Sequence, residues 1–258
     1  MGKIIVVTSG KGGVGKTTLT ANVGIALSKL GEKTVVIDTD MGLRNLDLAL
    51  GLENLVLNDI IDVATGECKL RDAVIRDSKI GQLAFLPASQ FKSTELLTDE
   101  KYAESLRSLS KRFDYVLVDS PAGIDKGFET AVSVCDMVIV VVNPDPYSLR
   151  DADKVVGICE GRGISDIRLV INRMRPDMVR SGIMLNIDSI IESLGIRLIG
   201  VVEEERQMVK YCIEGTPAVL QEKSKSGKVF TDIARRIKGE NVPVVDYKRK
   251  SGLFGIFK

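Results

Sequence analysis

The sequence predicts an α/β fold, a doubly wound and mainly parallel β-sheet with helices on both faces. Short runs rich in Val and Ile recur along the 258 residues, and stretches with helical periodicity separate most of them. Such alternation of strands and helices is typical of a parallel sheet. Most of the runs are apolar throughout, so we expect strands that are buried on both faces.

The expected elements follow one another along the chain. The strands are Ile4 to Thr8, Thr34 to Asp38, Leu83 to Pro87, Tyr115 to Asp119, Met137 to Val142, Ile167 to Asn172 and Ile196 to Val202. The helices are Thr17 to Leu30, which Gly31 ends, Asp99 to Lys111, Ser148 to Glu160 and Asp188 to Leu194. Right-handed crossovers would bring the loops after the strands to one edge of the sheet, where ligands bind.

The composition excludes several kinds of site. The chain has no histidine, which excludes histidine general bases, Ser-His-Asp triads and most zinc sites. A formal net charge of +1 argues against a chain built to coat nucleic acid. The four cysteines form no CxxC pair, and we interpret them as small core residues in a reducing cytosol: Cys68, Cys135, Cys159 and Cys212.

A phosphate-binding motif lies between the first predicted strand and the first predicted helix. Residues 10–18, GKGGVGKTT, fit the pattern GxxxxGK[ST] in the context that the motif requires. The glycines let main-chain N–H groups turn toward phosphate oxygens, and the start of the helix adds its positive end. Lys16 would supply a full charge to the outer phosphates, and the Thr17 hydroxyl would bind Mg²⁺. These residues predict the P-loop NTPase version of the fold.

Carboxylates end two of the predicted strands. Asp38 and Asp40 follow the second strand two residues apart, where both can face the phosphate edge or serve as helix caps. The apolar strand that ends at Asp119 has the Walker B form. In a chain without histidine, positioning of the attacking water must fall to carboxylates and main-chain groups. The sequence therefore predicts a magnesium and nucleotide site at this edge.

The loop itself departs from an ordinary P-loop, which needs no lysine directly after its first glycine. The KGGVGKTT run resembles the deviant Walker A loop of the MinD/ParA family of P-loop ATPases. Residues 40–48, 86–90 and 119–124 resemble further stretches of the MinD branch of that family, in order along the chain as far as about Lys238. The CxxC pair of the iron–sulfur carriers in the same superfamily is absent.

The resemblance implies an ATP hydrolase that converts ATP and water to ADP and phosphate, with Mg²⁺. Lys11, Lys16 and Asp40 would be catalytic: Lys11 reaches across a dimer to the partner's ATP, and Asp40 orients water. The nucleotide would be held by Lys11, Gly12, Gly13, Val14, Gly15, Lys16, Thr17 and Thr18, and Mg²⁺ by Thr17, Asp38 and Asp119. By residue type alone, Lys11 could equally be a solvated surface lysine.

The same resemblance places an adenine site at Asn172 and Arg173, whose plainer interpretation is a strand-end turn. At Glu203 to Glu205 this chain has acidic residues but lacks the proline that is common in the MinD branch. Arg150, Asp151 and Asp153 would lie on the surface where a MinC-type division inhibitor and a MinE-type or other topological regulator bind. A charged, exposed first helical turn would explain these three residues as well.

The composition changes after Val245, and we expect a P-loop ATPase domain over residues 1–245 and an amphipathic membrane-targeting tail over residues 246–258. In a helix, Leu253, Phe254 and Phe257 would share one face with Ile256 beside it, flanked by lysines and an arginine. This pattern is typical of a segment that lies in the interface of an anionic membrane. A C-terminal strand, or a tail that docks on the domain itself, is the alternative.

These expectations combine into one function. The chain would be a cytoplasmic ATPase that forms a homodimer with ATP, attaches peripherally to the cytoplasmic face of the cell membrane and recruits a division inhibitor to control septum placement. Hydrolysis would release it, and nucleic acid is not an expected partner. The alternative is a ParA-like or flagellar-number ATPase that positions DNA or another cargo.

Overall fold

The structure is a computed structural model, and it describes residues 1–41, 44–77, 82–90, 96–124 and 126–244. Eight strands form one sheet in the order β3-β4-β2-β5-β1-β6-β7-β8. The strands are β1 (Lys3–Thr8), β2 (Thr34–Asp38), β3 (Ile75–Arg76), β4 (Leu83–Leu86), β5 (Tyr115–Asp119), β6 (Met137–Val142), β7 (Ile167–Met174) and β8 (Arg197–Glu203). All neighbouring pairs are parallel except β3 with β4.

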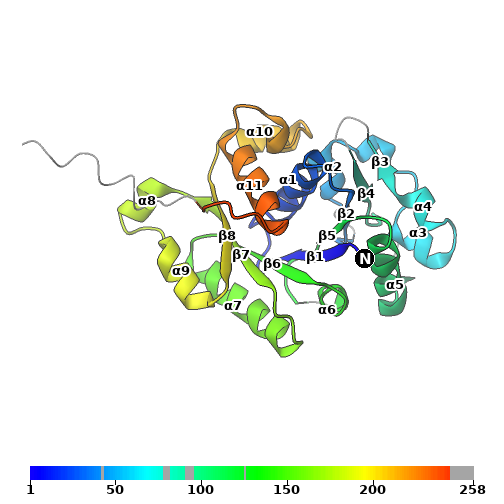
Figure 1. Ribbon diagram of the computed structural model, residues 1–258, viewed down its shortest axis with the longest axis horizontal. Coiled ribbons are helices and arrows are strands. Elements are labelled where there is room, and N and C mark those ends of the chain that lie inside the picture. The colour runs from blue at the N-terminus through cyan, green and yellow to red at the C-terminus, as the bar shows by residue number, and fades with distance from the viewer. Residues whose placement is uncertain (42–43, 78–81, 91–95, 125, 245–258) are drawn as a thin grey trace, which may run out of the picture.

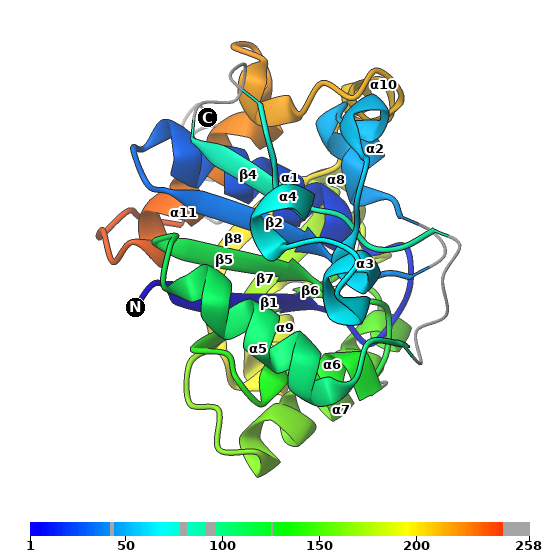
Figure 2. The ribbon, with the colours of Figure 1, turned by 90° about the vertical axis from the view of Figure 1, so that its right-hand side faces the viewer.

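Helices cover both faces of this sheet, as Figures 1 and 2 show. On one face lie α1 (Lys16–Lys29), α2 (Leu46–Leu50), α10 (Gln207–Ile213), η4 (Ala218–Leu220) and α11 (Lys225–Ile237). On the other lie α3 (Ile60–Thr65), α5 (Asp99–Ser110), α6 (Lys126–Val132), α7 (Pro146–Gly161) and α9 (Ile187–Leu194). Shorter elements complete the described chain: η1 (Glu53–Leu55), α4 (Leu70–Ala73) and α8 (Pro176–Arg180).

The central strand β1 shows how the sheet separates two cores. Ile4 and Val6 belong to the core beneath α5, α6 and α7, whereas Ile5 and Val7 belong to the core beneath α1 and α11. Successive side chains of a strand point to opposite faces, so a strand of this kind must be apolar at every position. The prediction of strands buried on both faces is therefore confirmed.

The predicted strands and helices are confirmed to within about two residues at their ends, as boundaries usually are. The helix α11 is not among the predicted helices, although Phe230, Ile233, Ala234 and Ile237 are buried at helical spacing. Its first turn, Lys-Ser-Gly-Lys, is polar and contains a glycine, which has a low helix propensity. The beginning of this helix is therefore difficult to recognise in the sequence. The Ser224 side chain caps this helix by accepting a hydrogen bond from the Gly227 N–H.

Two further findings concern composition. The interpretation of the cysteines as core residues holds for buried Cys159 and fails for Cys212, which is exposed on α10. No helix in the described ranges combines the length and the hydrophobicity that crossing a bilayer requires.

Candidate functional site

The phosphate loop connects the centre of the sheet to a buried helix. It leaves β1 after Thr8, and α1 begins at Lys16 with Gly15 as its N-cap in a left-handed conformation, at φ 100°. Gly13 is also left-handed, at φ 74°. Glycine adopts these conformations without the strain that a side chain would impose. The loop therefore lies at the carboxyl edge of the sheet, where the sequence predicted a ligand site.

Lys16 is held within this edge. It is buried, and its Nζ donates a hydrogen bond to Ser9 Oγ at 3.1 Å. Ser9 Oγ in turn donates to the Lys11 carbonyl at 2.7 Å, so one serine ties the lysine to the loop. Burial lowers the pKa of Lys16, and the charges of Asp119 and Asp40 oppose that shift. Ser9 is not among the predicted site residues, and its position directly after the first strand is the only sequence signal for it.

Two buried carboxyls stand side by side at the ends of adjacent strands. Asp38 and Asp119 are register partners in the β2–β5 pair, and both are almost fully buried. Burial raises the pKa of Asp119 to about 8 and that of Asp38 to about 6, and mutual repulsion adds to the shift of Asp119. To be ionised together, the two groups need a compensating cation, which Lys16 supplies only in part.

Hydrogen bonds fix the orientation of this pair. Asp38 accepts from the main-chain N–H groups of Asp40 and Leu46, at 2.9 and 3.0 Å. Asp119 accepts from the Thr20 hydroxyl at 3.4 Å and interacts with the hydroxyl of Thr17. Thr20, which was not predicted as a site residue, lies one turn after Lys16 on the buried side of α1.

The oxygens gathered here suit magnesium. Mg²⁺ prefers hard oxygen ligands and takes few of them from protein, with water and phosphate completing its shell. No cluster of three or more His, Cys, Asp and Glu side chains with the form of a metal site occurs among the residues that the structure describes. A pair of carboxyls beside the hydroxyl of Thr17 fits an ion that is bound together with a nucleotide.

Lys11 differs from Lys16 in its surroundings. Its side chain is exposed, as are Gly12 and Gly13 next to it, whereas Val14 is buried against the core. The outer rim of the phosphate loop therefore faces solvent on the described part of the chain.

Asn172 and Arg173 lie near the end of β7, and the structure brings Asn172 to the phosphate loop. Asn172 Nδ2 donates to the Val14 carbonyl at 2.7 Å. Arg173 is exposed and has a left-handed conformation, at φ 54°. Glu205 lies just after the neighbouring strand β8. Its carboxylate accepts hydrogen bonds from Ser224 Oγ and the Ser226 N–H, and so holds the start of α11.

The charged residues predicted for partner binding lie in the first two turns of α7. Arg150 and Asp153 are exposed, and Asp151 is half-buried and forms an ion pair with Lys154 at 3.6 Å. A Cβ atom on Gly10 would lie 2.3 Å from the main chain of Asp151. This helix therefore packs directly on the phosphate loop.

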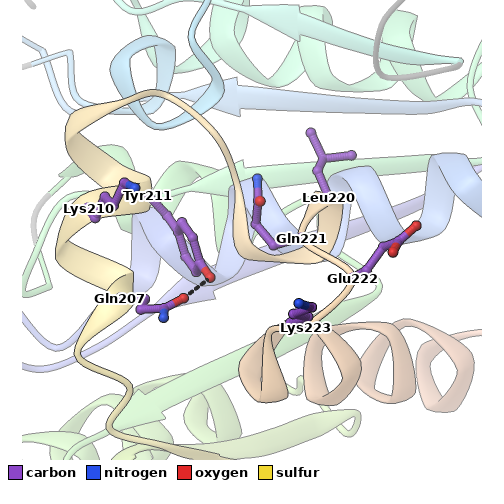
Figure 3. A pocket seen from close by; sticks show the side chains of 7 residues that line it. All are labelled: Gln207, Lys210, Tyr211, Leu220, Gln221, Glu222 and Lys223. Atoms are coloured by element: carbon purple, nitrogen blue, oxygen red, sulfur yellow. Dashed lines mark hydrogen bonds between the residues drawn. The ribbon is translucent and has the colours of Figure 1, made fainter.

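A separate cavity of about 630 Å³ lies between α10 and the segment before α11 (Figure 3). In it the Tyr211 hydroxyl donates to Gln207 Oε1 at 2.5 Å. None of its lining residues belongs to the predicted site. The predicted membrane residues Leu253, Phe254, Ile256 and Phe257 lie outside the described residues.

Comparison with known proteins agrees with this geometry. A family model described as an AAA domain matches residues 2–161. A putative septum site-determining protein MinD from Emiliania huxleyi is 47% identical over 248 residues, which cover 96% of this chain and 91% of that protein.

Solved structures of MinD proteins are also similar to this chain. A chain of the MinC:MinD cell division protein complex of Aquifex aeolicus superposes with a TM-score of 0.88 at 44% identity, covering 95% of this chain and 99% of that one. The septum site-determining protein MinD of Pyrococcus horikoshii, complexed with Mg-ADP, gives 0.81 at 30% identity and covers 92% of this chain and 96% of its own.

Proposed function

The chain belongs to the septum site-determining MinD branch of the MinD/ParA family of P-loop ATPases, and from that premise we propose how its site works as a switch. It is an ATP hydrolase. In the proposed cycle ATP and Mg²⁺ bind at the phosphate loop, two copies dimerise on the nucleotide, and the dimer attaches to the membrane and recruits a MinC-type division inhibitor. Hydrolysis separates the dimer and releases it.

The contrast between the two lysines of the phosphate loop carries this proposal. Lys16 is buried within its own site, whereas Lys11 is exposed on the rim. A cation on the rim is free to reach phosphate bound by a second copy, as an arginine finger does when another subunit supplies it. Dimerisation would then depend on the γ-phosphate, because Lys11 of each copy would bind that group in the other copy.

The residues of the chain would divide the chemistry among them. Lys16 and the main-chain N–H groups of Gly12 to Thr18 bind the phosphates and stabilise the charge that develops on them. Asp40, whose main-chain N–H is tied to Asp38, orients the attacking water. Thr17, Asp38 and Asp119 would hold Mg²⁺, which would supply charge neutralisation at the phosphates. On this assignment Asn172 and Arg173 contact the base.

Membrane attachment would come from residues 246–258. Partial burial of four apolar side chains contributes roughly 4–6 kcal/mol, and each basic residue near an anionic surface adds about 1 kcal/mol. Ordering about eight residues costs roughly 8 kcal/mol or more. The membrane affinity of one tail is therefore marginal, whereas two tails on one dimer bind together and gain orders of magnitude in avidity.

The partner would bind at the start of α7. Arg150 and Asp153 are exposed there, and the helix packs on the phosphate loop at Gly10. A surface in contact with the loop can differ between nucleotide states, which would restrict the MinC-type inhibitor and a MinE-type or other regulator to the ATP-bound form.

Sedimentation with vesicles tests the cycle. Purified protein is mixed with anionic liposomes, or with duplex DNA, in the presence of Mg²⁺ and either a nonhydrolysable ATP analogue or ADP. We expect sedimentation with liposomes only with the ATP analogue, and loss of it on deletion of residues 248–258 with nucleotide binding intact. Unchanged vesicle binding after the deletion would refute the tail's role.

Two controls separate the steps. Lys11→Ala should still bind nucleotide but remain monomeric and off the vesicles. Salt-sensitive binding to DNA instead of liposomes would favour the alternative, a ParA-like positioning of DNA cargo.

A further inference from the structure

Asn172 makes a contact that base recognition does not require. Its amide nitrogen donates to the carbonyl oxygen of Val14, in the middle of the phosphate loop, at 2.7 Å. The two residues are 158 positions apart in the chain, so only the neighbouring positions of β7 and the loop bring them together. The contact ties the phosphate loop to the end of a strand.

The hydrogen bond fixes the direction of one peptide group. The structure has no cis peptide bond among its described residues, so the C=O of Val14 and the N–H of Gly15 point in opposite directions. With the carbonyl held toward Asn172, the Gly15 N–H is directed away from that side chain. In a phosphate loop the main-chain N–H groups must face the anion, and a carbonyl turned inward would repel it.

The local backbone explains why such a restraint is needed. Gly13 and Gly15, on either side of Val14, are both left-handed glycines with wide conformational freedom. The Val14–Gly15 peptide turns about ψ of Val14 and φ of Gly15, and because glycine leaves φ free, this peptide reorients easily unless something outside the loop holds it. Gly15 also makes room for the restraint, because a Cβ atom there would lie 2.3 Å from Asn172 Nδ2.

The end of β7 is shaped for this contact. The pairing of β7 with β8 is irregular between Ile171 and Met174, where the residue after Asn172 takes its left-handed conformation. An irregularity of this kind redirects a side chain out of the regular strand pattern.

We propose that Asn172 is a positioning residue for the phosphate loop: it holds the Val14–Gly15 peptide in the orientation that binds polyphosphate, whatever base the nucleotide carries. The inference deepens the proposed function and rests on it, since it presumes that this loop binds the nucleotide. It assigns Asn172 a role that extends to ligands with no base at all.

Binding of a ligand without a base tests this role. Affinities for Mg-ATP and for magnesium tripolyphosphate are measured by competition against labelled ATP, for the full chain and for Asn172→Ala and Asn172→Leu. Leucine has the branched shape of asparagine but no hydrogen-bond donor. We expect both variants to lose about tenfold in affinity for tripolyphosphate, a factor that fits the loss of one partly buried hydrogen bond, and at least as much for ATP.

Asn186→Ala is the matched control. Asn186 also makes a single hydrogen bond between its side chain and the main chain, accepting from the Ser189 N–H at 2.8 Å, but at the exposed start of α9. That variant should unfold at a lower temperature and keep both affinities.

The outcomes are distinct. A loss of threefold or more for tripolyphosphate supports the inference, whether ATP loses the same factor or a larger one. A loss for ATP with less than a threefold change for tripolyphosphate overturns it and leaves Asn172 as a base contact only, and unchanged binding of both overturns it as well. Thermal melting without ligand shows that each variant is folded. Failure of the unmodified protein to bind Mg-ATP would instead refute the proposed function.

Discussion

Replacement of Asp119 by asparagine should make the ligand-free protein less sensitive to alkaline pH. Burial and the neighbouring Asp38 raise the pKa of Asp119 from 3.8 to about 8 in the folded protein. Between these values the folded state holds a proton that the unfolded chain has lost. The contribution of Asp119 to the free energy of unfolding is therefore largest below pH 4, and it falls as the pH rises toward 8.

The size of the effect follows from this shift. One such group changes the free energy of unfolding by about 1.4 kcal/mol per pH unit. Between pH 5 and 7.5 the unmodified protein should lose about 3 kcal/mol that Asp119→Asn does not lose, or on the order of 6–12 °C in melting temperature. Asp38, with its pKa raised to about 6, contributes in the same direction in both proteins and largely cancels in the difference.

Calorimetric melting of the two proteins at several pH values, without nucleotide and with a chelator, measures this difference. Asp232→Asn, on the partly exposed face of α11, controls for the general effect of removing one negative charge. Addition of Mg²⁺ and ATP should stabilise the unmodified protein more than the variant. The melting temperature of Asp119→Asn minus that of the unmodified protein should rise from pH 5 to 7.5. A value that stays constant or falls would refute the account of the buried acidic pair.

Three further substitutions should separate binding, hydrolysis and folding. Lys16→Ala should abolish ATP binding measured by calorimetry, because it removes the one cation buried within the described loop; retained micromolar affinity would contradict its role. Asp40→Ala should keep ATP binding and ATP-dependent dimerisation while phosphate release slows at least tenfold, and normal turnover would count against its role in orienting water. Arg236→Met should lower the free energy of unfolding by about 2–4 kcal/mol in a denaturant titration. The reason is that the guanidinium of Arg236 donates to the carbonyls of Ile199, Val242 and Pro243, which would lose their partner. An unchanged midpoint would show that these groups find other donors.

The sequence predicted the sheet well because its strands are buried on both sides. A run such as Met137–Val142 is apolar at all six positions, and its short length and its richness in Val and Ile favour a buried strand over a buried helix. The phosphate loop was predictable for a different reason, since its chemistry requires glycines, a lysine and a hydroxyl in one continuous stretch.

Residues that act through distant partners were less accessible. Ser9 and Thr20 are ordinary polar residues in the sequence, and only the fold brings one to Lys16 Nζ and the other to Asp119. Glu205 belongs to an acidic run for which the sequence predicted no contact, and only the fold shows that its carboxylate holds the start of α11.

The sequence by itself determined the kind of chemistry. The phosphate loop, the strand-end carboxylates and the absence of histidine can all be identified without the tertiary structure. The tertiary structure decided which groups meet. Asp38 and Asp119 become neighbours only because β5 inserts between β1 and β2, and Asn172 reaches Val14 only because β7 ends beside the loop. Contacts across 80 or more residues depend on strand order and register, which local residue preferences do not encode.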